Sequence, residues 1–118
     1  MMSWSGWRRE STMAEYRIRY AQQAVDDLDA IFDYICLDNP DAARKMLQSF
    51  KTSIGRLAST PYLGAALRTD SPLLISSGYR YIVVSPYLVF YRVVDDEVRI
   101  GRILHSRQDW LSLLFGMR

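Results

Sequence analysis

The chain has 118 residues, enough for one domain and too few for two. Hydrophobic residues make up 49% and charged residues 24%, as in an ordinary globular protein, and no stretch approaches the ~20 apolar residues that a membrane-spanning helix needs. The 15 basic and 13 acidic residues give a net charge of +2, a weaker bias than proteins with many phosphate contacts usually show.

Cysteine and histidine occur once each. Cys36, as the single cysteine, excludes a disulfide within the chain and favours a reducing, cytoplasmic location. One cysteine and one histidine also argue against a structural zinc site. We expect no cofactor and no membrane partner.

The first twelve residues differ from the rest of the chain. They are rich in Trp and Ser and lack periodicity, whereas the sequence from Met13 reads directly into a strand. We therefore predict that residues 1–12 are a disordered or non-native extension and that residues 13–118 form a single domain. The alternative is a genuine N-terminal arm anchored by Trp4 and Trp7.

A strand and a helix are predicted next. Tyr16 to Tyr20 alternates apolar and Arg side chains, which is typical of a half-buried strand. Gln22 to Leu37 reads as a helix, because its apolar residues recur every three or four positions and form one stripe. That stripe contains Ala24, Leu28, Ile31 and Ile35.

The dipeptide Asn39-Pro40 separates this helix from a second one. Proline cannot continue a helix but suits the first position of a new one, where the Asn39 side chain can cap it. The apolar positions from Ala43 to Ala58 follow a 3.6-residue period and predict a helix to about Ser59. The short connection implies an antiparallel helical hairpin.

The C-terminal half reads as strands. Residues 60–64 form a loop, and residues 65–72 are ambiguous. Three segments are strand-like: Leu73 to Val84, with an interruption around Ser76-Ser77-Gly78, Leu88 to Val94 and Glu97 to Leu104. Turns separate them at Ser85-Pro86 and Asp95-Asp96. Trp110 to Phe115 predicts a short apolar helix. The fold class is α+β: an N-terminal strand and a helical hairpin packed on a mostly antiparallel sheet of about four strands.

Charge is unevenly distributed along this pattern. Five aspartates crowd the first helix, and most arginines fall in the C-terminal half, so a local basic face is possible despite the balanced total. Arg102 shares its strand side with Val98, Ile100 and Leu104, which predicts burial and pairing with an acidic residue or the C-terminal carboxylate.

The order of these segments resembles the RelE/ParE superfamily of type II toxins, and within it the ParE-like, plasmid-stabilization branch. The resemblance covers about Tyr16 to Asp109 and is carried by the segments AVDDLDAIFDYI, DNPDAA, TPYLGAALR and FYRVVDDEVRIGRILHSRQD. It implies a strand, two helices and a C-terminal antiparallel sheet. It also implies a toxin that a cognate antitoxin neutralises in a hetero-oligomer.

Two targets follow from the resemblance. RelE-like members cleave mRNA on the ribosome, and ParE-like members poison DNA gyrase. Cleavage would need acid–base groups and cations, for which His105, Arg80, Arg92 and Arg102 are the candidates. The net charge of +2 is weaker than that of the strongly basic RelE-like nucleases, and the ending LHSRQD resembles that of ParE-like proteins. The resemblance therefore favours a non-enzymatic gyrase inhibitor over a ribosome-dependent endoribonuclease.

Several residues are candidates for binding the target or the antitoxin. Arg68 follows a loop in which ParE-like sequences often carry an arginine, and the apolar tail offers a surface that an antitoxin segment would cover on folding. The alternatives are a solvated Arg68, a tail that closes the core, and a His105 bonded to Asp109 or to a backbone carbonyl. The candidates are Arg68, Arg102, His105, Arg107, Trp110, Leu113, Leu114 and Phe115.

Overall fold

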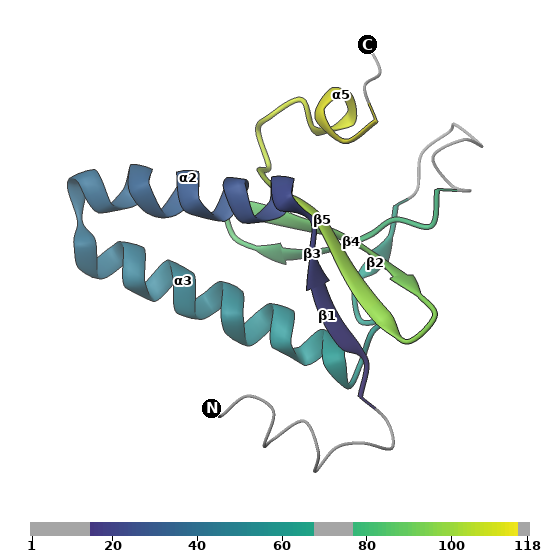
Figure 1. The fold of residues 1–118 in the computed structure, drawn as a ribbon. Coiled ribbons are helices and arrows are strands. Elements are labelled where there is room, and N and C mark those ends of the chain that lie inside the picture. The colour runs from purple at the N-terminus through teal and green to yellow at the C-terminus, as the bar shows by residue number, and fades with distance from the viewer. Residues whose placement is uncertain (1–14, 68–76, 116–118) are drawn as a thin grey trace.

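The computed structural model describes residues 15–67 and 77–115, with the side chain of Phe115 left aside. The predictions for residues 1–12 and for Arg68 lie outside these ranges. The elements in chain order (Figure 1) are β1 (Arg17–Tyr20), α2 (Gln22–Asp38), α3 (Pro40–Gly55), a short 3-10 helix η1 (Arg56–Ala58), β2 (Ala65–Ala66), β3 (Arg80–Val84), β4 (Tyr87–Val94), β5 (Glu97–His105) and α5 (Trp110–Phe115).

The helical hairpin forms as predicted. Asn39 ends α2 through its backbone N–H, which donates to Ile35 O at 2.8 Å, and its side-chain oxygen accepts from Ala42 N at 3.1 Å to cap α3. Pro40 occupies the first turn of α3. The second helix ends at Gly55 and continues as η1 to Ala58, close to the predicted end at Ser59.

The sheet has five strands in the order β1-β5-β4-β3-β2, one more than expected. The neighbouring pairs are antiparallel except β1 and β5, which run parallel and join the two ends of the domain. The additional strand is β2, in which Ala65 and Ala66 pair with Tyr81 and Arg80. Two alanines carry no strand periodicity, so this edge strand had no signal in the sequence.

Each face of the sheet carries an apolar cluster. The larger cluster faces the hairpin, where Ala24 of α2 and Phe50 of α3 meet Val89, Val98 and Ile100 of the central strands. The smaller one lies on the opposite face and contains Leu67, Phe90 and Leu104, with Trp110 and Leu114 of α5 packed against it. Figure 1 shows the far end of the hairpin projecting beyond the sheet, and Tyr34 and Leu37 near that end are exposed.

A register shift in β5 corrects one prediction. Tyr91 pairs with Ile100 but Phe90 pairs with Arg102, so Gly101 is an extra residue. The faces exchange at this bulge: Ile103 follows Ile100 into the hairpin-facing cluster, and Leu104 belongs to the other cluster. The expectation that Arg102 and Leu104 share a side with Ile100 was therefore wrong, because strict alternation ends at Gly101.

Across residues 15–67 and 77–115, none of the helices combines the length and the apolar character that crossing a bilayer requires.

Candidate functional site

A groove of about 470 Å³ opens on the sheet face away from the hairpin. The end of β1, the first turn of α2, strands β4 and β5 and helix α5 all contribute to it. Its polar lining is mainly arginine, with two tyrosines beside it. The residues around it are Arg19, Tyr20, Ala21, Gln23, Tyr79, Arg92, Glu97, Arg99, Ile100, Gly101, Arg102 and Leu114.

Arg19, Arg99 and Arg92 form a row across three neighbouring strands, which we call the arginine row. In the sheet register Arg19 of β1 lies opposite Arg99 of β5, and Arg99 lies opposite Arg92 of β4. Residues before and after them, such as Ile18 and Val98, point into the hairpin-facing cluster, so the three arginines share the other face. Like charges directly opposite each other destabilise a sheet, so this arrangement needs an explanation beyond stability.

The Glu97 carboxylate binds two of the three residues of the arginine row, Arg19 and Arg99. Glu97 accepts from Arg99 Nε at 2.8 Å, from Arg19 Nη1 at 3.1 Å and from Arg17 Nη2 at 3.3 Å. The hydrogen bond from Arg99 and the nearby arginine charges lower the pKa of the Glu97 carboxyl. Arg17 also pairs with Asp96 at 3.2 Å, so Glu97 is the carboxylate that Arg19 and Arg99 share, and the groove, which Arg92 also lines, keeps an excess of positive charge.

Arg92 contributes to that excess without an ion pair in the described part of the chain. Its guanidinium stacks over the Tyr79 ring, 5.1 Å from the ring centre. The Tyr79 ring in turn lies on Gly101, where an added Cβ would meet the Tyr79 hydroxyl at 3.0 Å. The bulge glycine therefore makes room for the tyrosine that supports Arg92.

Arg102 lies at the edge of the groove in a mostly buried ion pair. Its Nε and Nη2 donate to the Asp27 carboxylate at 2.8 and 3.0 Å, and this bond raises the pKa of the Arg102 guanidinium. The same carboxylate accepts from Ile103 N at 2.9 Å, beyond the point where β1 stops covering the edge of β5. Nη1 also donates to Leu113 O of α5 at 3.3 Å. The predicted pairing of Arg102 with an acidic residue is confirmed.

Arg80 serves the loop before β2. Its Nε donates to Gly64 O at 3.0 Å, its Nη2 donates to Tyr62 O at 3.4 Å, and its guanidinium stacks on the Tyr62 ring at 5.1 Å. Arg80 is not part of the groove lining.

His105 also lies apart from the groove lining. Its ring meets the edge of Tyr87, with 5.4 Å between ring centres, and Tyr87 belongs to the hairpin-facing cluster. Its Nδ1 accepts from Arg107 N at 3.0 Å, and its backbone N–H donates to the Gln108 side chain at 2.7 Å. The alternative interpretation had His105 bonded to Asp109 or to a backbone carbonyl, but its Nδ1 accepts from a backbone N–H, and the Asp109 carboxylate caps α5 through Ser112 N and Oγ. The structure thus separates His105 from Arg92 and Arg102.

The C-terminal helix divides the remaining candidates. Trp110 packs on Phe90, with ring centres 5.4 Å apart, and Leu114 joins the same cluster. Leu113 is 43% exposed, and Arg107 is exposed as well. The side chain of Phe115 lies outside the described residues.

Sequence reasoning missed several groove residues: Arg19, Tyr20, Tyr79, Glu97 and Arg99. The alternation of β1 did place Arg17 and Arg19 on the polar side of that strand. The partner strand could not be identified, because β1 pairs in parallel with a strand about 80 residues later in the chain. In the ranges that the structure covers, no three His, Cys, Asp or Glu side chains gather where a metal ion would be held.

Comparison with known proteins supports one family. Residues 18–110 match the family model for the ParE toxin of the type II toxin–antitoxin system parDE. The putative toxin Y4kP of Sinorhizobium fredii is 34% identical over 104 residues, covering 86% of this chain and all of that protein. Toxin RelE2 of Caulobacter vibrioides is 34% identical over 90 residues, covering 76% of this chain and 94% of that toxin.

A solved structure agrees with the sequence matches. In the chromosomal ParDE toxin–antitoxin system from P. aeruginosa, one chain superposes with a TM-score of 0.63 at 26% identity. The superposition covers 77% of this chain and 96% of the other. The chain therefore belongs to the ParE toxin family of type II toxin–antitoxin systems, within the RelE/ParE superfamily.

Proposed function

We propose that this chain arrests growth by inhibiting DNA gyrase and that a cognate antitoxin neutralises it. Family membership supports a toxin role, but a shared fold alone does not choose between gyrase and the ribosome. The choice depends on what the groove offers chemically.

The observation that carries the proposal is that, among the described residues, the groove lining holds no histidine and its one carboxyl group is bound by arginines. Cleavage of RNA by its own 2′-hydroxyl needs a proton acceptor and a proton donor beside the charge-stabilising cations. The carboxyl in the lining, Glu97, has a lowered pKa because Arg99 and its neighbours bind it, which makes it a weak base. His105 contacts Tyr87 and is not in the lining. These contacts support a toxin that acts by binding.

The antitoxin is proposed by analogy and by surface chemistry. The P. aeruginosa structure is that of a ParDE toxin–antitoxin system, and the matching family model is likewise that of the toxin of the parDE system. On this chain Leu113 of α5 and Arg107, before it, are exposed and available to a partner segment. We propose that the antitoxin contacts four residues of this chain in a toxin–antitoxin hetero-oligomer: Arg68, Arg107, Leu113 and Phe115. Trp110 and Leu114 would support this surface by packing against the cluster that contains Phe90.

The test uses purified chain, freed from its antitoxin, with gyrase, ATP and plasmid that is supercoiled for the cleavage assay and relaxed for the supercoiling assay. We expect protein-linked, cleaved plasmid to accumulate after denaturation and supercoiling activity to fall. The His105→Ala variant should act as strongly as the wild type, since His105 is outside the groove lining.

The competing function is cleavage of ribosome-bound mRNA. It would be established by cleavage of mRNA in a purified translation system, loss of that cleavage in His105→Ala, and no effect on gyrase. That combination would reject gyrase inhibition.

A further inference from the structure

We propose that the arginine row and the groove around it bind a single strand of DNA. The inference rests on the proposed gyrase inhibition in one respect: that function would bring cleaved DNA to the toxin. The argument for the site itself comes from the register, the charges and the shape of this sheet face.

The first step is the charge. Arg19, Arg99 and Arg92 face the same way on three successive strands, which lie roughly 5 Å apart. Glu97 offsets part of this charge, and Arg92 has no ion pair among the described residues. A row of guanidinium groups at this spacing suits successive anionic groups along an extended chain, because each guanidinium offers several N–H donors to phosphate oxygens.

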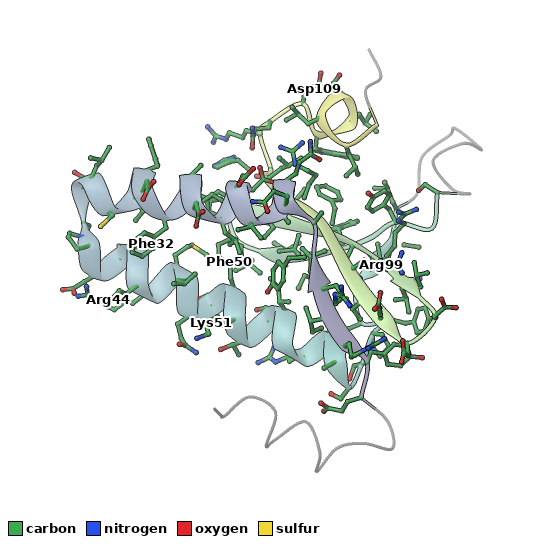
Figure 2. All side chains as sticks on the ribbon, in the orientation of Figure 1. Phe32, Arg44, Phe50, Lys51, Arg99 and Asp109 are labelled. Atoms are coloured by element: carbon green, nitrogen blue, oxygen red, sulfur yellow. The ribbon has the colours of Figure 1, made fainter. Side chains whose placement is uncertain are left out.

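The second step is the shape. A groove of about 470 Å³ falls within the ~300–1,000 Å³ of sites for small molecules, so it has room for one or two nucleotides. A duplex would leave its bases paired and out of reach of the lining. Figure 2 shows Arg99 on the sheet, far from the turn between α2 and α3, while the first turn of α2 and Leu114 of α5 border the groove.

The third step separates nucleic acid from an acidic peptide. Tyr20, 41% exposed, lines the same groove as the arginine row, whereas the Tyr79 ring beside it is covered by the Arg92 guanidinium. Each nucleotide carries one phosphate and one ring, so it meets a guanidinium and a tyrosine together, as in other single-strand binding sites. An acidic peptide offers carboxylates without a ring at each position.

The consequence for inhibition follows directly. When gyrase has cut its DNA, a strand end is free of its duplex partner. A toxin that holds this strand by its phosphates would oppose its return for rejoining, and the cleaved state would persist. The toxin then needs no chemistry of its own, in agreement with the groove lining.

The test is fluorescence anisotropy of the purified full chain with labelled oligothymidylate of about eight nucleotides, within the site sizes typical of such grooves. We expect binding that weakens as salt rises. Arg92→Gln should weaken it about fivefold or more and make the slope of log affinity against log salt shallower by about 0.7. Arg92→Lys should restore the slope, because the charge is retained.

Lys51→Gln is the matched control. It removes one exposed positive charge from α3, which Figure 2 shows on the hairpin away from Arg99. We expect its affinity for the oligonucleotide to stay within about twofold of the wild type. Melting temperatures of all variants should agree, since both side chains are exposed.

Several outcomes would overturn the inference: no binding of the oligonucleotide, an equal loss with Lys51→Gln, tighter binding of oligoglutamate or of RNA of equal length, or undiminished gyrase poisoning by Arg92→Gln. The last would leave the gyrase proposal standing. Conversely, a wild-type chain that binds the oligonucleotide but leaves gyrase unaffected would reject gyrase inhibition and retain the groove as a DNA site.

Discussion

At the scale of single residues, Arg102 joins three elements through one guanidinium: it belongs to β5, pairs with Asp27 of α2 and donates to Leu113 O of α5. The sequence predicted its pairing from strand alternation, although Gly101 had already broken that alternation. The prediction succeeded because a partly buried arginine must find an anion on whichever face it lies. Which anion it finds depends on how α2 packs, which the local sequence does not encode.

Replacing Asp27 tests this junction. Asp27→Asn should lower the free energy of unfolding by about 2 kcal/mol, because it leaves Arg102 without its counter-ion and weakens the bond to Ile103 N. The measurement is urea unfolding. Asp29→Asn, an exposed change on the same helix, should stay within about 0.5 kcal/mol of the wild type. Equal effects would show that the pair does not stabilise the fold.

Glu97 gives a prediction for pH. Its pKa is lowered in the folded state, first by the hydrogen bond from Arg99, so ionised Glu97 stabilises the fold at pH values above its ordinary pKa of 4.5. That contribution is lost as the pH falls through the lowered, folded-state value, because protonation removes the anion. The urea midpoint of the wild type should exceed that of Glu97→Gln at pH 7, and the difference should shrink in acid. A constant difference would contradict the prediction.

At the scale of elements, local patterns predicted the helices within a few residues and the strands β4 and β5 within one residue. Asn39-Pro40 and the 3.6-residue stripes were sufficient because the hairpin is made by local interactions. The parallel β1–β5 pairing and the two-residue strand β2 depend on contacts between distant segments. Two alanines in β2 form a strand only because β3 lies beside them.

The loop before β2 is held by a buried tyrosine. The Tyr91 hydroxyl donates to Pro61 O and accepts from Gly64 N, both at 2.8 Å. An added Cβ at Gly64 would lie 2.6 Å from Tyr81 O and from the Tyr91 hydroxyl. Gly64→Ala should therefore cost about 2 kcal/mol or more of folding free energy, measured by thermal unfolding.

Gly55→Ala is the control for that substitution. Gly55 ends α3, and an added Cβ there has no neighbour within 4 Å. This variant should be as stable as the wild type or more stable by up to about 1 kcal/mol, because alanine loses less conformational freedom in a helix. Unchanged stability in Gly64→Ala would mean that the loop can move away from Tyr91.

In helix α5, Trp110 packs against the sheet, whereas Leu113 is exposed and is proposed to contact the antitoxin. Trp110→Ala should lower the free energy of unfolding by about 1–2 kcal/mol, because it uncovers Phe90. Leu113→Ser, at an exposed position, should leave stability within about 0.5 kcal/mol but weaken antitoxin binding. Titration calorimetry with the co-purified antitoxin checks the second effect. Full antitoxin affinity in Leu113→Ser would remove this residue from the proposed contact surface.

At the scale of the whole molecule, net charge was a poor guide to surface chemistry. The total of +2 argued against phosphate binding, yet the sheet register gathers Arg19, Arg99 and Arg92 on one face. Five compensating acids lie on the hairpin and not in the groove: Asp26, Asp29, Asp33, Asp38 and Asp41. Asp27 instead pairs with Arg102 at the edge of the groove. A basic site can thus arise in a nearly neutral chain once folding separates the two signs of charge.

The choice between gyrase and the ribosome as the target can also be tested in cells. The experiment is brief induction of the chain in bacteria, followed by pulses of labelled thymidine and labelled methionine. We expect DNA synthesis to fall before protein synthesis and DNA-damage signalling to rise. The reason is that cleaved gyrase complexes block replication before they affect protein synthesis. Arg92→Gln should delay this fall, whereas Lys51→Gln and His105→Ala should match the wild type, since neither residue lines the groove. An early fall in methionine incorporation that His105→Ala abolishes would instead identify a ribosome-directed nuclease. The order of the two falls thus distinguishes the two targets, and the variants report which residues act on them.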